Sequence, residues 1–232
     1  MYENIGENLS AMISIPTVSG AGNEPFYHIE EYRNYLRTTF QTLFTAADIT
    51  PVGEALLIKL RGTGSRFLHE EKTPGTPLPV LFTGHMDVVP AGPGWNFEPY
   101  AVTRKEGYLV GRGTLDDKGP SVVALHAMKF WKDLQDAGEA PQFPYTVRFL
   151  FGANEESGMA DVAYYHKHYD DPAFLFTPDA EFPVCNAEKG CFGGTFKSAK
   201  IENGVIRSWS GAEATNAIPS QSECIVAAPL AD

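Results

Sequence analysis

Apolar residues recur at three- and four-residue spacing in four stretches of the chain, which is the pattern of helices that bury one face. In the first stretch, Ile5, Leu9 and Met12 fall on one side of a helix that Pro16 would end. The pattern predicts helices over residues 2–15, 25–46, 120–136 and 159–168.

Short apolar runs alternate with these helices and have the length of buried strands. Residues 62–77, which carry Gly, Pro and Thr, indicate an exposed loop. Strands alternating with helices predict an α/β fold with a mostly parallel sheet flanked by helices. The strands are expected over residues 56–60, 80–83, 145–151 and 173–176, with a smaller pair over 100–103 and 108–110.

The character of the chain changes near residue 190. Alternating residues surround Asn203-Gly204, a dipeptide favoured in tight β-turns, and predict a hairpin there. A further strand pattern begins at Glu223. We therefore expect one domain over residues 1–190 and the beginning of a second over residues 191–232.

The charge balance narrows the classes of partner. The formal net charge is −11 at pH 7, which argues against binding to nucleic acid or to an anionic membrane. No apolar run has the roughly 20 residues of a membrane span, and the first residues lack the pattern of a signal peptide. The cysteines, Cys185, Cys191 and Cys224, form no C-x-x-C pair. They are expected as buried free thiols, which fits a reducing cytoplasm.

One histidine and five carboxylates follow the predicted strands or precede the long helix. The carboxyl ends of parallel strands meet at one edge of a sheet, so side chains placed there converge. A histidine nitrogen with several carboxylate oxygens is the donor set of a zinc hydrolase, and manganese or cobalt suits it as well. The candidates are His85, Asp87, Asp116, Glu155, Glu156 and Asp179.

The chemistry of such a site suggests a role for each candidate. Asp87 is placed to hold the second ring nitrogen of His85, and Asp116 to bridge two ions. Glu155 and Glu156 are adjacent, so one would bind metal while the other acts as general base. Each residue alone also has a plainer explanation: a structural histidine, a solvated Glu pair, or an Asp116-Asp117 helix cap. Their placement at successive strand ends favours the metal site.

Four ordered motifs resemble the di-zinc metallopeptidase family of aminoacylases, desuccinylases and dipeptidases, and most of all its PepV-type, carnosinase-like bacterial dipeptidases. The resemblance implies a zinc-exopeptidase-like catalytic domain followed by the start of an α+β lid domain. The motifs are Gly84-His-Met-Asp-Val-Val-Pro90, Gly111-Arg-Gly-x-x-Asp-Asp-Lys-Gly-Pro120, Asn154-Glu-Glu-Ser-Gly158 and Pro178-Asp-Ala-Glu-Phe-Pro183.

The resemblance also implies residue roles. His85 and Asp179 would bind one zinc ion, Glu156 the other, and Asp116 both. Glu155 would be the general base, and Asp87 would support His85. A cis peptide bond is expected between Asp116 and Asp117. The implied reaction is hydrolysis of the peptide bond in dipeptides or short peptides by zinc-activated water.

The family's second zinc also takes a histidine from a later segment, whereas the last histidine here is His168. We therefore expect one ion or fewer to be held, and little peptidase activity from this chain alone. Self-association or a C-terminal partner fragment would cover sheet that the missing strands leave open. Two alternatives stay open: an N-acyl amino acid deacylase, and an inactive metal-binding fragment.

Overall fold

The computed structural model describes residues 4–19, 28–46, 50–52, 55–60, 62–63 and 78–181, then 183–190, 192–197, 199, 202, 204–211, 218–219 and 221–227. Most of the loop predicted at residues 62–77 and the start of the helix predicted at 25–46 lie outside these ranges. The chain divides into two compact units, Met1–Ala180 and Glu181–Asp232. The first unit ends before the predicted boundary at residue 190, and the assignment of a catalytic and a lid domain stays a prediction.

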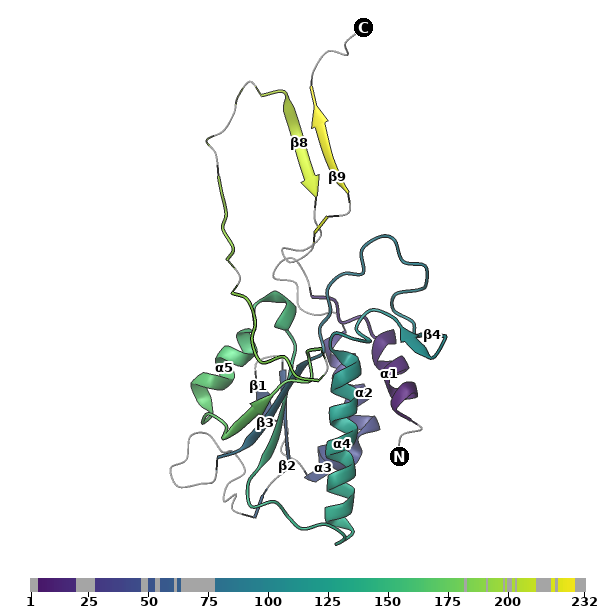
Figure 1. Cartoon of the computed structure of the whole chain (residues 1–232), viewed down its shortest axis with the longest axis vertical. Coiled ribbons are helices and arrows are strands. Elements are labelled where there is room, and N and C mark those ends of the chain that lie inside the picture. Colours follow the sequence, from purple (N-terminus) through teal and green to yellow (C-terminus); the bar gives the residue numbers. More distant parts are fainter. Residues whose placement is uncertain are drawn as a thin grey trace. The chain divides into compact units, whose positions relative to one another are not determined.

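A five-stranded sheet forms the centre of the first unit (Figure 1). Strand β3 runs parallel to both of its neighbours, β6 and β7, whereas β2 is antiparallel to β1 and β6. All strands except β2 therefore point the same way, which confirms the predicted mostly parallel sheet. The order is β1 (Thr50–Val52), β2 (Ala55–Leu60), β6 (Val147–Gly152), β3 (Val80–His85) and β7 (Phe174–Phe176).

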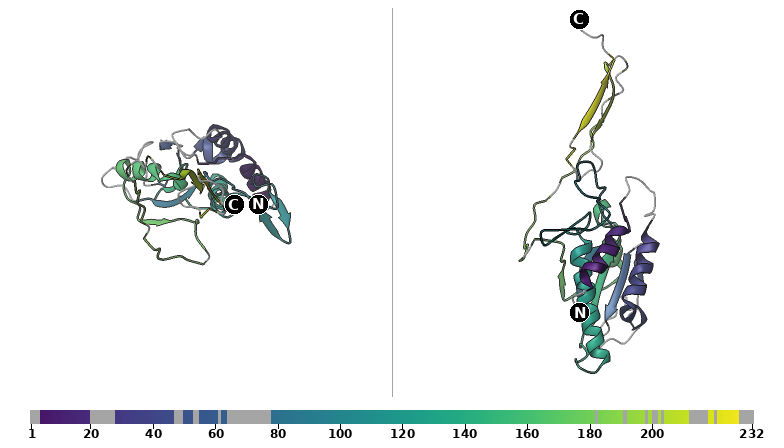
Figure 2. Two further views of the ribbon diagram at one scale, coloured as in Figure 1. Left: turned by 90° about the horizontal axis from the view of Figure 1, so that it is seen from above. Right: turned by 90° about the vertical axis from the view of Figure 1, so that its right-hand side faces the viewer.

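Helices cover both faces of this sheet because successive strand residues point to opposite sides. Phe149 and Phe151 of β6 join the larger core with α1–α4, and Leu150 between them joins the smaller core with Tyr165 of α5. Seen from above, green α5 and the purple helices α1–α3 lie on either side of the strands (Figure 2, left). The helices are α1 (Ile5–Ser14), α2 (Ile29–Thr39), α3 (Gln41–Ala46), α4 (Lys118–Asp136) and α5 (Ala160–His168).

The single helix predicted over residues 25–46 is wrong in one respect, because it is broken at Phe40 into α2 and α3. Phe40 leaves helical geometry, with φ −112° and ψ 44°, while its N–H still bonds the carbonyl of Leu36. Phe40 and Leu43 are both fully buried. The apolar spacing continues through the break, so the pattern alone does not reveal it. The other three predicted helices exist with slightly shifted ends.

A small hairpin of β4 (Thr103–Lys105) and β5 (Tyr108–Val110) stands apart from the main sheet. Glu106 and Gly107 form its turn with φ of 51° and 86°, the left-handed region that glycine tolerates best. The first strand of this hairpin begins and ends later than the predicted residues 100–103. Among the described residues, none of the helices is both long and apolar enough to cross a membrane.

The second unit contains an antiparallel pair, β8 (Ile206–Gly211) and β9 (Ser222–Val226). The predicted hairpin around Asn203-Gly204 lies partly outside the described residues, because most of its first arm directly before Asn203 is not described. Among the described residues, β8 pairs with the later strand β9, and residues 192–197 form no strand. Asn203 itself lies outside the described residues. The expected burial of the thiols is also wrong for Cys185 and Cys224, which are free but exposed. Cys224 lies in β9, and a two-stranded pair has no interior to bury it in. Cys191 lies outside the described residues.

Candidate metal centre

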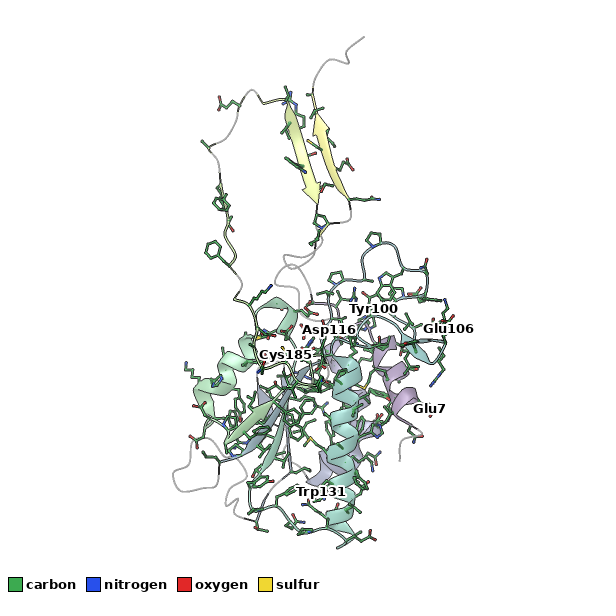
Figure 3. The ribbon with its side chains drawn as sticks, viewed as in Figure 1. Glu7, Tyr100, Glu106, Asp116, Trp131 and Cys185 are labelled. Carbon is green, nitrogen blue, oxygen red and sulfur yellow. The ribbon has the colours of Figure 1, made fainter. Side chains whose placement is uncertain are left out.

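The parallel strands β6, β3 and β7 place their carboxyl ends side by side, and the predicted candidates gather there. His85 is the last residue of β3. Glu155 and Glu156 lie in a short 3-10 turn, Glu155–Ser157, just after β6, and Asp179 follows β7. Asp116 precedes α4, so Figure 3 shows it at the opposite end of that helix from Trp131.

The imidazole of His85 is the centre of the cluster. Its Nε2 lies 3.0 Å from Asp116 Oδ1, 3.3 Å from Asp179 Oδ2 and 3.9 Å from Glu155 Oε2. The His85 side chain is only 2 % exposed, whereas Asp116 is 57 % exposed. One buried nitrogen therefore faces carboxylates delivered by three separate segments.

Asp87 contacts the second ring nitrogen of His85 through two of its oxygens. The Nδ1 atom of His85 lies 2.9 Å from the backbone carbonyl of Asp87 and 3.4 Å from its carboxylate Oδ1. The Asp87 carboxylate also accepts the backbone N–H groups of Glu155 and Glu156, each at 3.2 Å. Asp87 thus connects the histidine strand to the turn that carries both glutamates.

The contacts of His85 indicate which nitrogen is available to a ligand. A carbonyl oxygen only accepts hydrogen bonds, so Nδ1 must carry the proton that it donates to Asp87. Nε2 is buried and makes no hydrogen bond of acceptable geometry among the described residues. A neutral imidazole would therefore direct its lone pair at carboxylates, which is unfavourable unless a cation lies between them.

The pKa values of the cluster point to the same need for positive charge. Burial lowers the pKa of His85, but Asp116, Asp179 and Asp87 outweigh it and hold that pKa well above its ordinary value. Burial, followed by the charge of Asp116, raises the pKa of Glu156 to about 7. Burial also raises the pKa of Glu155. Without a cation, the side chains at this edge of the sheet retain protons, and a bound metal would displace those protons.

Two sets of three side chains bring potential ligand atoms within 4.8 Å of one another. One set is His85, Glu155 and Glu156, and the other is His85, Asp117 and Asp179. A nitrogen and several carboxylate oxygens at these positions fit the donor set of zinc, manganese or cobalt.

Sequence reasoning missed Asp117, which it treated only as a helix cap or as the partner of Asp116 in a cis bond. The Asp116–Asp117 bond is cis, as the resemblance implied. Asp117 occupies the N-cap position of α4, but its side chain makes no capping bond. It reaches β3 instead, where its Oδ2 accepts the backbone N–H of His85 at 3.0 Å. Its position beside Asp116, just before an apolar helix, was the available signal.

The sequence of the chain is similar to those of known proteins. The chain is 38% identical over 150 residues to a β-Ala-Xaa dipeptidase of Lactobacillus delbrueckii subsp. lactis, covering 63% of this chain and 31% of that protein. It is 34% identical over 152 residues to the putative dipeptidase YtjP of Bacillus subtilis (strain 168), covering 62% and 31%. The chain thus spans about a third of the length of these relatives.

The fold likewise matches a solved structure. Human carnosine dipeptidase 1 superposes with a TM-score of 0.54 at 21% identity, over 75% of this chain and 38% of that one. At this identity the likeness concerns the fold alone. A sequence model of peptidase family M20/M25/M40 matches residues 81–213, which is more than half of the chain and includes every candidate ligand. The chain therefore belongs to peptidase family M20/M25/M40.

Proposed function

We propose that this chain supplies metal-binding and catalytic residues for hydrolysis of the peptide bond in dipeptides or short peptides. The observation that carries the proposal is the buried Nε2 of His85, which faces carboxylates from separate segments at the carboxyl edge of the sheet. The names of the relatives, a β-Ala-Xaa dipeptidase and a putative dipeptidase, support the choice of substrate. The activity is a property proposed for the whole protein, of which this chain spans a part.

Each residue of the cluster takes one role in this proposal. His85 and Asp179 would hold one ion, Glu156 would be a ligand of a second where a second is bound, and Asp116 would be a ligand of both. A zinc ion bound here supplies a Lewis acid and lowers the pKa of a water molecule. Manganese or cobalt suits the same donors.

Glu155 is the proposed general base. Its side chain is 33 % exposed, so water reaches it, and its raised pKa makes it a stronger proton acceptor than an ordinary glutamate. Asp87 fixes the backbone of Glu155 and Glu156 and thereby the direction of both side chains.

The decisive experiment is elemental analysis of metal per chain after zinc loading, paired with hydrolysis of a dipeptide panel that includes β-alanyl dipeptides. Bound zinc with turnover supports the proposal, and Glu155→Gln is then expected to keep the metal and lose the turnover. Hydrolysis of N-acyl amino acids in place of dipeptides favours a deacylase. Bound zinc without turnover contradicts activity of the isolated chain. If a separate C-terminal fragment of a relative then restores turnover, the active enzyme is formed from two chains.

A second copy of the chain or a C-terminal partner fragment is predicted to cover the open edge of the sheet. Within the part of the chain that the structure describes, strand β7 pairs only with β3. Its side chains Phe174, Leu175 and Phe176 are 59 %, 48 % and 42 % exposed. Exposed apolar edge strands favour further pairing. Light scattering of the isolated chain, with and without such a fragment, tests whether a second copy or a partner covers this edge.

A further inference from the structure

Strand β3 extends beyond the end of its neighbour β7, so on that side the last residues of β3 have no strand partner among the described residues. The β3–β7 pairing ends where Phe82 opposes Phe176. The N–H of Met86 donates to the Gly152 carbonyl on the β6 side. Because successive N–H groups of a strand point to alternate sides, the N–H of His85 points toward the side where β7 has already ended.

Asp117 provides the acceptor that a strand would otherwise supply. Its Oδ2 accepts the His85 N–H at 3.0 Å and the hydroxyl of Ser121 at 2.8 Å. Asp117 is 0 % exposed, so water does not compete for these bonds. A buried N–H that lost this acceptor would be left unpaired, which is costly.

The close approach of α4 to β3 depends on Gly84. A Cβ atom at Gly84 would lie 2.5 Å from both Asp117 Oδ2 and Ser121 Oγ, and 3.3 Å from the ring of Phe149. Any larger residue would push the Asp117 carboxylate away from the strand. The glycine before the histidine is therefore explained by this contact, and not by backbone conformation.

We propose that Asp117 is a positioning residue of the metal centre: it replaces the missing strand at His85 and fixes the imidazole relative to Asp116 and Asp179. This inference rests on the proposed metal site for its functional meaning. The bonded oxygen holds the histidine backbone, so Asp117 acts through His85 and not as a ligand. Its other oxygen, Oδ1, is buried and has no hydrogen-bond partner among the described residues.

The test compares Asp117→Ala and Asp117→Asn with the wild type. Asparagine keeps an oxygen that accepts both bonds, whereas alanine removes it. Leu125→Ala serves as the control, because Leu125 is a fully buried residue of α4 whose loss lowers stability without touching His85. The first readout is the hydrogen-exchange rate of the His85 amide in the metal-free protein, measured by NMR. The second is zinc affinity, measured by competition with a chelator.

Asp117→Ala is expected to speed exchange at His85 by about tenfold or more beyond the effect of Leu125→Ala, and to weaken zinc binding by roughly 10–100-fold. Asp117→Asn should restore most of both. Unchanged exchange in Asp117→Ala overturns the inference. Loss of zinc in Asp117→Asn as complete as in Asp117→Ala also overturns it, since direct coordination would then be the role.

The experiment separates this inference from the proposed function. If the wild-type chain binds no zinc, the proposed metal centre fails, while the exchange rate at His85 still decides whether Asp117 holds the histidine. Gly84→Ala offers a second disruption of the same contact with the carboxylate left intact. It should reproduce the faster exchange of Asp117→Ala, and normal exchange in this variant contradicts the inference.

Discussion

The carboxylate of Asp87 fixes the backbone of Glu156, because its Oδ2 accepts the Glu156 N–H at 3.2 Å while its other oxygen accepts the N–H of Glu155. Asp87 is 0 % exposed. Two residues after the end of β3, it joins that strand to the turn after β6.

Substitution Asp87→Asn should therefore weaken both folding and metal binding. An amide group has one acceptor oxygen, so one glutamate N–H loses its partner and faces an NH2 group. We expect the free energy of unfolding to fall by roughly 1–3 kcal/mol and zinc affinity to fall by roughly 10–100-fold. Chemical denaturation and chelator competition measure the two effects. Asp171→Asn, at an 82 % exposed site, is the control, and equal effects in both variants would contradict this role.

Substitution His85→Ala should abolish tight zinc binding, because it removes the nitrogen donor of the cluster. His166→Ala is the matched control: His166 is 58 % exposed and contacts Asp171 away from the site. Isothermal titration with zinc into each metal-free variant measures the difference. Retained tight binding by His85→Ala would show that the metal lies elsewhere.

The metal-free chain should lose stability as pH rises from about 4.5 to about 7. Burial raises the pKa of Glu156 from 4.5 to about 7 and that of Asp117 from 3.8 to about 7. Between these limits the folded chain binds more protons than the unfolded chain, so raising the pH favours unfolding. Saturating zinc should reverse the trend, because it binds the ionised form. Thermal melts across this pH range, with chelator or with zinc, measure both slopes, and parallel slopes would refute the linkage.

Substitution Lys118→Met should destabilise the first unit. The Lys118 side chain is 1 % exposed, and its Nζ donates to the carbonyls of Met12 and Ile15 at 2.9 and 2.8 Å. Methionine fills similar space but removes both bonds. The Ile15 carbonyl still accepts the N–H of Thr17 at 3.0 Å, so the loss falls chiefly on the Met12 carbonyl and costs roughly 1–3 kcal/mol.

Part of that cost is offset, because the variant no longer has to bury an amine. Burial of this amine is unfavourable, as the lowering of the Lys118 pKa to about 7 indicates. Lys129→Met, at a half-buried position of the same helix where the amine pairs only with the side chain of Asp133 among the described residues, should change stability by less than about 0.5 kcal/mol. Urea denaturation of the two variants tests the contrast, and equal midpoints would argue against a structural role for Lys118.

The fold was predictable where one physical signal dominated. The apolar run at residues 80–83 gave β3, and the alternation of strands and helices gave the mostly parallel sheet, because burial on both faces leaves an uninterrupted apolar pattern. The turn signal at Asn203-Gly204 did not indicate that β8 would pair with the later strand β9, because a local turn signal does not specify every partner of a strand. The sequence pattern did not predict the break at Phe40, because its apolar side chain fits either a continuous or a broken helix.

The candidate site was predictable as a set but not in its contacts. Strand ends brought His85, Glu155 and Asp179 together, as the parallel topology requires. The sequence did not indicate that the Asp87 carboxylate would also bind the glutamate backbone, or that the Asp87 carbonyl would contact His85. Nor did it indicate that the side chain of Asp117, at the N-cap position of α4, would bond the backbone of β3. Both depend on long-range packing, which a sequence pattern does not encode.

Strand β7 is three residues long, lies at the edge of the sheet, and leads directly to Asp179. An ion held by both His85 and Asp179 would act as a cross-link between this weakly paired strand and the centre of the sheet. Unfolding the edge would then require releasing the ion, so the free energy of binding adds to the local stability of β7. The metal would therefore stabilise the position of β7, the strand that leads to the ligand Asp179.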